Sequence, residues 1–213
     1  MYEYQAESVF NYTITNNGAD GNAFDTIAAS GENAVILHHI ENDSKVKKDN
    51  LILMDLGAQY NQYASDISRT LPVSGKFTER QKELYNIVLN TQKEVIKIMI
   101  PGTPFSKMNE IAKEFFAKEL INLGLIQNEE EVAKYYYHGV GHYMGLDTHD
   151  LGSREVDLQP GMVITCEPGL YIAEENIGIR IEDDILITEK GNEVLSKAII
   201  KEVDDIERFM SNR

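Results

Sequence analysis

The sequence predicts an α+β fold built on a curved, mostly antiparallel sheet. Apolar runs with strand character occupy residues 34–71, helical periodicity occupies residues 78–123, and glycine-rich, β-branched sequence occupies residues 139–187. Strands that precede and follow a block of helices, instead of alternating with them, are typical of α+β domains. With 213 residues, the chain is expected to form a single domain over residues 1–213.

The N-terminal part predicts one helix and then a set of short strands. Residues 1–18 are mildly helical, and residues 34–38 form an apolar run that we expect to be a buried strand. Residues 51–57 predict a second strand. Residues 60–71 alternate in part, which predicts a strand that returns beside it after a turn at residues 57–61.

The middle of the chain predicts three helices. Thr78 and Gln81 form a capping box, and the apolar stripe that follows continues as far as the Pro-Gly pair at residues 101–102. A second helix is expected from about residue 107 to residue 123, and a short third helix ends near Tyr135.

The last third predicts short strands punctuated by glycines, followed by a terminal helix. Residues 163–166, 170–172 and 179–187 are rich in β-branched and other apolar side chains, which favour strands. Residues 204–210 predict the helix.

Composition excludes several classes of protein. The net charge of −15 argues against a nucleic-acid partner, whose phosphates require a basic face. This acidity reflects either solubility or bound metal, and charge alone does not choose between them. No apolar run approaches the roughly 20 residues that cross a bilayer. Residues 1–5 lack a basic start and an apolar stretch, so we expect no secretory signal. With one cysteine, Cys166, no intrachain disulfide forms, and we expect a cytoplasmic protein.

Five ionisable residues stand in apolar or glycine-rich sequence, where charge is normally excluded. They are Asp55, Asp66, His142, Glu167 and Glu182. A buried carboxylate costs several kcal/mol unless a cation neutralises it. Four carboxylates and one imidazole are hard ligands that suit Mn²⁺, Mg²⁺, Fe²⁺, Co²⁺ or Zn²⁺. Taken alone, each residue is more often a turn, cap or structural residue, but together they predict two divalent ions and a hydrolase.

The segments around these residues resemble the pita-bread metallopeptidases of family M24. The segments are residues 53–57, 63–70, 138–150, 160–171 and 178–184. The resemblance extends from about residue 3 to residue 203 and implies the pita-bread fold, a curved antiparallel sheet covered by helices. Family members usually carry an N-terminal domain and a long helix that opens the catalytic domain. Because residues 1–5 resemble the sequence after that helix, we expect both to be absent here.

Within the family, residues 30–39 and the segment that ends at Asp150 resemble Xaa-Pro aminopeptidase (aminopeptidase P) most. This resemblance implies that a hydroxide bridging two metal ions hydrolyses the bond between an N-terminal residue and a following proline. Mn²⁺ is the expected metal, with Co, Zn, Fe or Mg as options. The expected partners are a peptide with proline at its second position and further copies of the chain in a homo-oligomer. Xaa-Pro dipeptidase (prolidase) and a catalytically impaired peptide-binding fragment of this fold stay alternatives.

The resemblance also assigns roles to individual residues. It implies that Asp55 binds one ion, that His142 and Glu167 bind the other, and that Asp66 and Glu182 bridge both. Glu167 is the expected proton carrier. Three further pocket histidines are expected to donate to the developing oxyanion or to hold the substrate carbonyl, and two residues are expected to support the ligands. The histidines are His38, His138 and His149, and the supporting residues are Arg180 and Tyr171.

Other interpretations of these residues stay open. Each histidine fits a buried structural role as well, and Arg180 fits a surface ion pair. His39 is expected to face away from His38, because neighbouring side chains on a strand point to opposite faces. Cys166 alternates away from Glu167 and is expected to be a small core residue.

Overall fold

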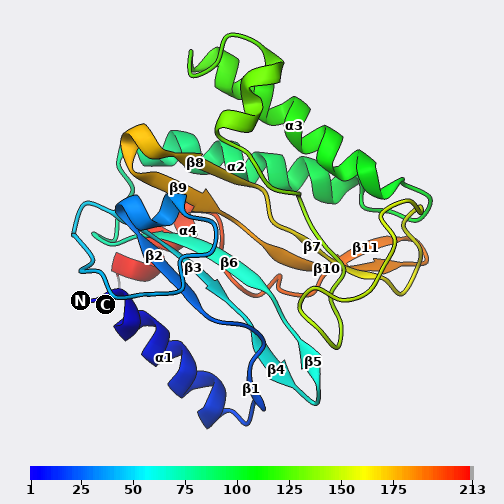
Figure 1. Cartoon of the computed structure of the whole chain (residues 1–213), viewed down its shortest axis with the longest axis horizontal. Helices are drawn as coiled ribbons and strands as arrows, with labels where there is room; N and C mark the ends of the chain where they lie inside the picture. Colours follow the sequence, from blue (N-terminus) through cyan, green and yellow to red (C-terminus); the bar gives the residue numbers. More distant parts are fainter. Residues whose placement is uncertain (212–213) are drawn as a thin grey trace.

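A computed structural model describes residues 1–211 and contains small antiparallel sheets flanked by helices (Figure 1). The helices are α1 (Glu3–Asn16), η1 (Gly31–Val35), α2 (Glu79–Ile98), α3 (Phe105–Asn122), η2 (Glu129–Lys134), η3 (Ala173–Glu175) and α4 (Val203–Ser211), where η marks a 3₁₀ helix. The strands are β1 (Gly21–Asn22), β2 (Ile27–Ser30), β3 (Leu51–Leu56), β4 (Ala58–Tyr60), β5 (Tyr63–Ala64), β6 (Ile67–Pro72), β7 (Val163–Cys166), β8 (Gly169–Ile172), β9 (Ile177–Arg180), β10 (Asp183–Thr188) and β11 (Gly191–Val194).

Every strand pairing among residues 1–211 is antiparallel. Two of the three-stranded sheets, β2-β3-β6 and β11-β10-β7, lie at the centre with the β8-β9 hairpin, while β1-β4-β5 extends from one end. In Figure 1, α2 and α3 lie on one side of these strands and α1 lies on the other, beside β2. The expected α+β fold with an antiparallel sheet is confirmed.

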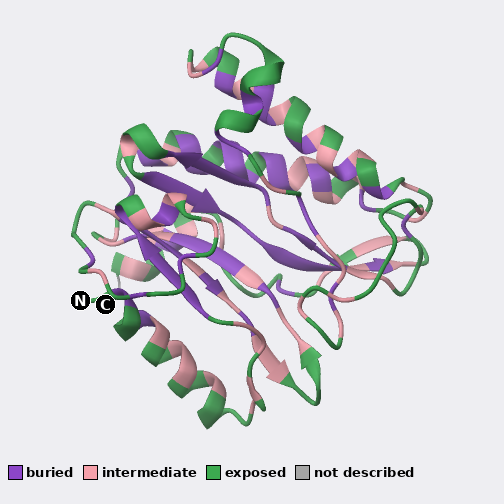
Figure 2. Cartoon of the chain, viewed as in Figure 1, coloured by how far each residue is buried: buried purple, intermediate pink, exposed green. Residues whose placement is uncertain are grey.

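The core lies between α2 and the strands, where Figure 2 shows continuous burial. Helix α2 begins at Thr78, whose side chain accepts the N–H of Gln81 while the Gln81 side chain accepts the N–H of Thr78, so the predicted capping box is present. From this start, Leu84 and Val88 reach the core fully buried. Each such side chain stabilises the fold by about 1.5–3 kcal/mol. No helix within residues 1–211 has both the length and the hydropathy that a bilayer crossing needs.

The apolar run at residues 34–38 is not a strand, which corrects the sequence-based prediction. Gly31 has φ = 58°, which turns the chain into η1, and Ala34 then packs against β9. That contact is tight, because a Cβ on Gly178 would lie 1.8 Å from the carbonyl oxygen of Ala34. The run is apolar because η1 packs on the hairpin. His38 is exposed and His39 is buried, so the two do face opposite ways.

The strand predicted at residues 60–71 is broken, and its turn comes later than expected. Tyr60 and Tyr63 pair across a two-residue loop in which Asn61 and Gln62 have φ of 49° and 71°. Positive φ at both central residues matches the twist of a tight hairpin. The sequence lacks the Asn-Gly pair that normally signals such a turn. Strand β6 then returns beside β3, as predicted.

The strand predicted at residues 179–187 is also two strands. β9 pairs with β8 and β10 pairs with β7, so the chain changes partners at Ile181 and Glu182. At this break, the N–H of Ile181 donates to Pro168 and the N–H of Glu182 donates to Ser68. The break therefore places Glu182 beside β6, where the chain passes from β9 to β10.

Glu3 at the start of α1 is fully buried and anchors this helix to the rest of the chain. Its carboxylate accepts hydrogen bonds from the backbone N–H groups of Ser30 and Ser44, the Ser30 hydroxyl and the Asn33 amide, and it lies 3.2 Å from Nε2 of His39. A hydrogen bond to a charged group contributes about 1.5–3 kcal/mol to stability. Buried donors would be left without an acceptor if this carboxylate were removed.

We therefore expect Glu3→Ala to lower the free energy of unfolding by about 3 kcal/mol or more, which corresponds to about 6–12 °C in melting temperature. Thermal unfolding followed by circular dichroism measures the change. Glu32→Ala, which removes an exposed acid from η1, is the control and should melt like the unchanged chain. Equal melting temperatures for the Glu3→Ala variant and this control would contradict the anchoring role.

Candidate metal centre

Asp55 and Asp66 meet where β3 and β6 run side by side. Asp55 lies near the end of β3 opposite Ser68, and Asp66 immediately precedes β6. Because Asp66 is two residues from Ser68, its side chain shares the face of Asp55 and is diagonal to it rather than directly opposite. Both are at least nine-tenths buried and line one cavity of about 400 Å³.

His142 reaches this cavity because the chain before it packs tightly on β7. A Cβ on Gly141 would lie 2.1 Å from the Thr165 carbonyl oxygen, so only glycine allows this approach. Nδ1 of His142 lies 3.0 Å from the carbonyl oxygen of Tyr143, which can only accept, so Nδ1 carries the proton. The lone pair of Nε2 is then free to bind a metal, and Nε2 lies 3.4 Å from Oδ2 of Asp66.

The two glutamates enter from the ends of neighbouring strands rather than from within them. Glu167 follows β7, and its Oε1 lies 3.5 Å from Nε2 of His142. Glu182 occupies the break before β10, and its Oε2 accepts the Ser68 hydroxyl at 2.7 Å. Both line the same cavity as Asp55 and Asp66, so the structure brings together all five predicted ligands.

The donor set fits divalent cations. Asp66, His142 and Glu182 offer ligand atoms that all lie within 4.8 Å of one another. Asp55, Asp66 and Glu182 each have one buried carboxylate oxygen without a hydrogen-bond partner. A buried oxygen without a partner carries its full desolvation cost, which a bound cation removes. Oxygen and imidazole donors suit Mn²⁺, Fe²⁺, Co²⁺ or Zn²⁺.

Without a cation, burial favours the protonated forms of Asp66 and Glu182. Burial, followed by the neighbouring carboxylates of Asp55 and Asp184, raises the pKa of Asp66 to about 9. Burial likewise raises the pKa of Glu182 well above its usual range. Burial raises the pKa of Glu167 to about 7, a rise that the neighbouring His142 and Arg180 oppose. Metal binding to this site must therefore displace protons.

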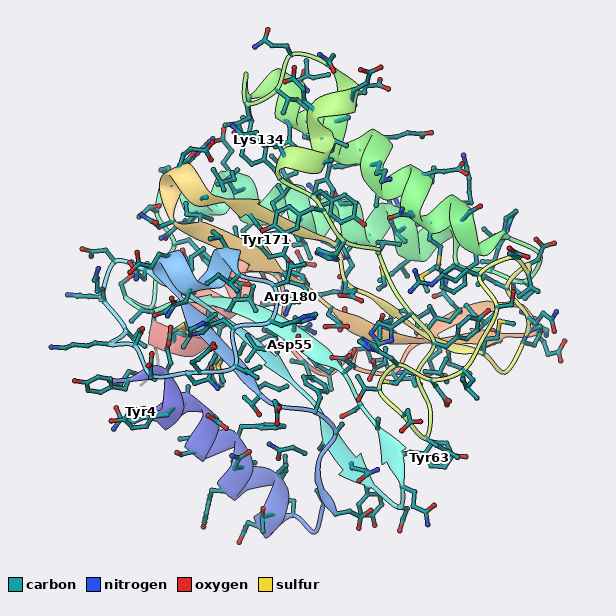
Figure 3. The ribbon with its side chains drawn as sticks, viewed as in Figure 1. Tyr4, Asp55, Tyr63, Lys134, Tyr171 and Arg180 are labelled. Atoms are coloured by element: carbon teal, nitrogen blue, oxygen red, sulfur yellow. The ribbon has the colours of Figure 1, made fainter. Side chains whose placement is uncertain are left out.

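A chain of hydrogen bonds runs from Asp55 to His138 behind the ligands, and Figure 3 shows Asp55, Arg180 and Tyr171 in line. Arg180 donates to Oδ2 of Asp55 at 2.6 Å, to the Ser68 hydroxyl at 2.8 Å and to the Tyr171 hydroxyl at 2.9 Å. It is only 4% exposed, so the surface ion pair considered above is excluded. Its planar fork fixes the orientation of the Asp55 carboxylate.

His138 is the last member of this series of hydrogen bonds and is a neutral imidazole. Burial, followed by the charge of Arg180, lowers the pKa of His138 to about 4. Its Nδ1 donates to the Gly139 carbonyl oxygen at 2.7 Å, so Nε2 accepts the Tyr171 hydroxyl at 2.9 Å. Both nitrogens are thus engaged, so His138 offers no free donor to the cavity.

His38 and His149 are the exposed histidines of the cavity wall. The ring of His149 meets the ring of His142 edge to face, with 4.4 Å between centroids. Burial, followed by the neighbouring His142, lowers the pKa of His149, so its neutral form is favoured. These two rings are placed to contact a bound molecule.

We expect Arg180→Lys to weaken metal binding by about 10–100-fold, because lysine lacks the planar guanidinium that donates to Asp55, Ser68 and Tyr171 from separate nitrogens. Calorimetric titration with Mn²⁺ measures the affinity. Arg80→Lys is the control, since Arg80 lies on α2, pairs with Glu175 and does not line the cavity. An affinity equal to that of the control would exclude the orienting role.

The sequence model of metallopeptidase family M24 matches residues 1–189 of the chain. The chain belongs to metallopeptidase family M24. Xaa-Pro aminopeptidases of Haemophilus influenzae and Escherichia coli are 39% and 40% identical to this M24 chain, over 99% of its length. The matches cover 53% and 52% of those proteins, so the chain spans about half the length of the curated relatives it matches.

Solved structures agree with this M24 assignment. A protein from Bacillus anthracis described as an aminopeptidase P is 54% identical, with a TM-score of 0.98 over 100% of this chain and 51% of that one. Zinc-substituted E. coli aminopeptidase P in complex with product is 38% identical, with a TM-score of 0.96 over 100% of this chain and 52% of that one. The predicted pita-bread fold and family are therefore confirmed.

Two residues of the M24 site escaped the sequence-based prediction. Asp184 is 5% exposed beside Asp66, and burial raises its pKa to about 7. The signal was present, because Asp184 precedes an apolar run just as Glu182 follows one. Arg154 lines the cavity from the loop before β7, and no pattern of sequence distinguishes it from a surface arginine.

Proposed function

We propose that this site hydrolyses the peptide bond between an N-terminal residue and a following proline, as an Xaa-Pro aminopeptidase does. The observation that carries the proposal is the convergence of Asp55, Asp66, His142, Glu167 and Glu182 on one cavity. The similarity to Xaa-Pro aminopeptidases supports the choice of proline. Two divalent ions, Mn²⁺ by preference, would be held by these five residues. When bound, they polarise the scissile carbonyl and lower the pKa of water.

Glu167 is the proposed proton carrier. It is the most exposed of the four acids, with a side chain 18% exposed. A carboxylate beside the attacking water can accept its proton and return it to the departing proline nitrogen. Thr165 donates to its Oε1 at 3.4 Å, which leaves Oε2 toward the cavity and 3.9 Å from Nδ1 of His138.

The remaining residues position the peptide and the ligands. His38 and His149, exposed in the cavity wall, are placed to hold the substrate carbonyl and the proline ring. Arg180 and Tyr171 keep the Asp55 carboxylate and the His138 ring in place. Their shared hydrogen bonds make these four groups act as one unit.

The test is an assay of this chain, loaded with Mn²⁺, on three peptides. An Xaa-Pro-Xaa tripeptide should lose its first residue, while an Xaa-Pro dipeptide and an Xaa-Ala-Xaa tripeptide should be cleaved at least about tenfold more slowly. Cleavage of the dipeptide alone would assign a prolidase instead. No cleavage of any peptide, with two ions bound, would show a peptide-binding fragment without activity.

The expected partners and compartment are part of the proposal. A homo-oligomer is supported by the exposed aromatic side chains Tyr4 and Tyr12 on α1, with 47% and 71% exposure. Cys166 is fully buried and forms no disulfide, which supports a reducing compartment such as the cytoplasm. Sedimentation of the purified chain tests whether it forms a homo-oligomer.

A further inference from the structure

Asp184 is a fifth buried carboxylate at the edge of the metal centre. Its Oδ2 accepts the backbone N–H of Asp66 at 3.3 Å, and its Oδ1 has no hydrogen-bond partner. Within residues 1–211, the other buried side-chain atoms without a partner belong to Asp55, Asp66 and Glu182, all of them expected metal ligands. Asp184 therefore has a buried oxygen without a hydrogen-bond partner, as three of the expected ligands do, although it is not one of the five.

Neighbouring acids at the start of β10 point to opposite sides of the strand. Glu182 and Asp184 point toward the metal centre, whereas Asp183 between them points the other way and pairs with Arg69 and Lys201. In the part of the chain that the structure describes, no ion pair joins Asp184 to a lysine, arginine or histidine. A buried carboxylate without a cation costs several kcal/mol. Divalent ions at the adjacent site would offset this cost.

Asp184 also lies between the segments that supply the ligands. It is opposite Thr165 in the β10–β7 register. The Thr165 hydroxyl accepts the N–H of His142 at 3.0 Å and donates to Glu167 at 3.4 Å. On its other side, Asp184 holds the backbone of Asp66, which precedes β6 and has no ladder partner for this N–H. Groups that hold ligands in this way commonly change metal affinity by 10–100-fold.

We propose that Asp184 is a positioning residue of the metal centre, which fixes the backbone of Asp66 and strengthens the binding of divalent cations through its negative charge. The proposal rests on the proposed function, because it requires metal at Asp66, His142 and Glu182. It adds a sixth side chain whose contribution does not depend on direct coordination.

Two substitutions separate the two parts of this role. Asp184→Asn keeps an oxygen that accepts from Asp66 and removes the charge, and we expect it to weaken Mn²⁺ binding about tenfold. Asp184→Val keeps a residue that suits a strand and removes both features, and we expect a loss of about 100-fold. Glu189→Gln removes one exposed charge just beyond β10 and serves as the control, which should leave the affinity unchanged.

The measurement is calorimetric titration of metal-free protein with Mn²⁺ at pH 8, together with thermal unfolding of the same samples. Because Asp184→Asn removes a buried charge, its metal-free melting temperature should equal or exceed that of the unchanged chain. A merely structural residue would lower it. Unchanged Mn²⁺ affinity, or a metal-free variant that fails to fold, would overturn the role of Asp184. An unchanged chain that binds no Mn²⁺ would overturn the metal centre as well.

Discussion

Replacing Glu182 with alanine is expected to reduce hydrolysis of an Xaa-Pro tripeptide by about 10³-fold or more. Glu182 is 1% exposed and shares one compact set of ligand atoms with Asp66 and His142. The proposed function makes Glu182 a ligand of both ions, so its loss should remove them together. A bound metal stabilises the transition state by several kcal/mol, and each 1.4 kcal/mol is a factor of ten in rate. Asp66→Ala should have the same effect for the same reason.

Elemental analysis after dialysis measures the loss of metal, and an assay with added Mn²⁺ measures the loss of hydrolysis. Glu189→Ala, which removes an exposed acid, is the control for the loss of one negative charge. Both ligand variants should stay folded without metal, because each removes a buried acid that no cation offsets. More than a few per cent of activity after metal titration would contradict the bridging assignment and would place Glu182 or Asp66 at one ion only.

The ligands could be predicted from the sequence because each is an acid or imidazole that breaks an apolar or glycine-rich pattern. Asp55 ends the apolar run of β3, and Glu167 follows the apolar run of β7. Such local conflicts mark functional sites, since charge in a core is otherwise selected against. The α+β class followed from the order of elements, and the Thr78 cap followed from a local motif.

What could not be predicted depends on contacts between distant residues. The run at residues 34–38 has the composition of a strand, but its conformation is set by Gly31 and by the contact of Ala34 with Gly178. The break at Ile181 depends on hydrogen bonds to Pro168 and Ser68, which no local pattern reveals. His138 likewise could be identified as a pocket residue, while its fixed tautomer depends on Tyr171.

Removing metal should make the stability of this protein fall steeply as pH rises above neutrality. The folded-state pKa values of Asp66, at about 9, and of Glu182, well above its usual range, exceed those of ordinary unfolded carboxyls near 4. Between these limits, the folded chain holds protons that the unfolded chain has released, so stability decreases with increasing pH. Asp183 does not interfere: burial alone would raise its pKa, but Arg69 and Lys201 hold it below the usual value. Its stabilisation is therefore lost only in acid.

The informative window is pH 7 to 8.5. The lowered pKa of His138 makes stability rise with pH, but that contribution is complete once the pH exceeds the ordinary histidine value near 6.5. Over this window we expect the metal-free melting temperature to fall by about 8–16 °C, because two protons held in the folded state change the free energy of unfolding by about 4 kcal/mol. Saturating Mn²⁺ displaces those protons, so the metal-loaded protein should melt at nearly constant temperature. Asp66→Asn should roughly halve the metal-free slope, and a metal-free melting temperature that stays level or rises would show that these carboxyls are already ionised.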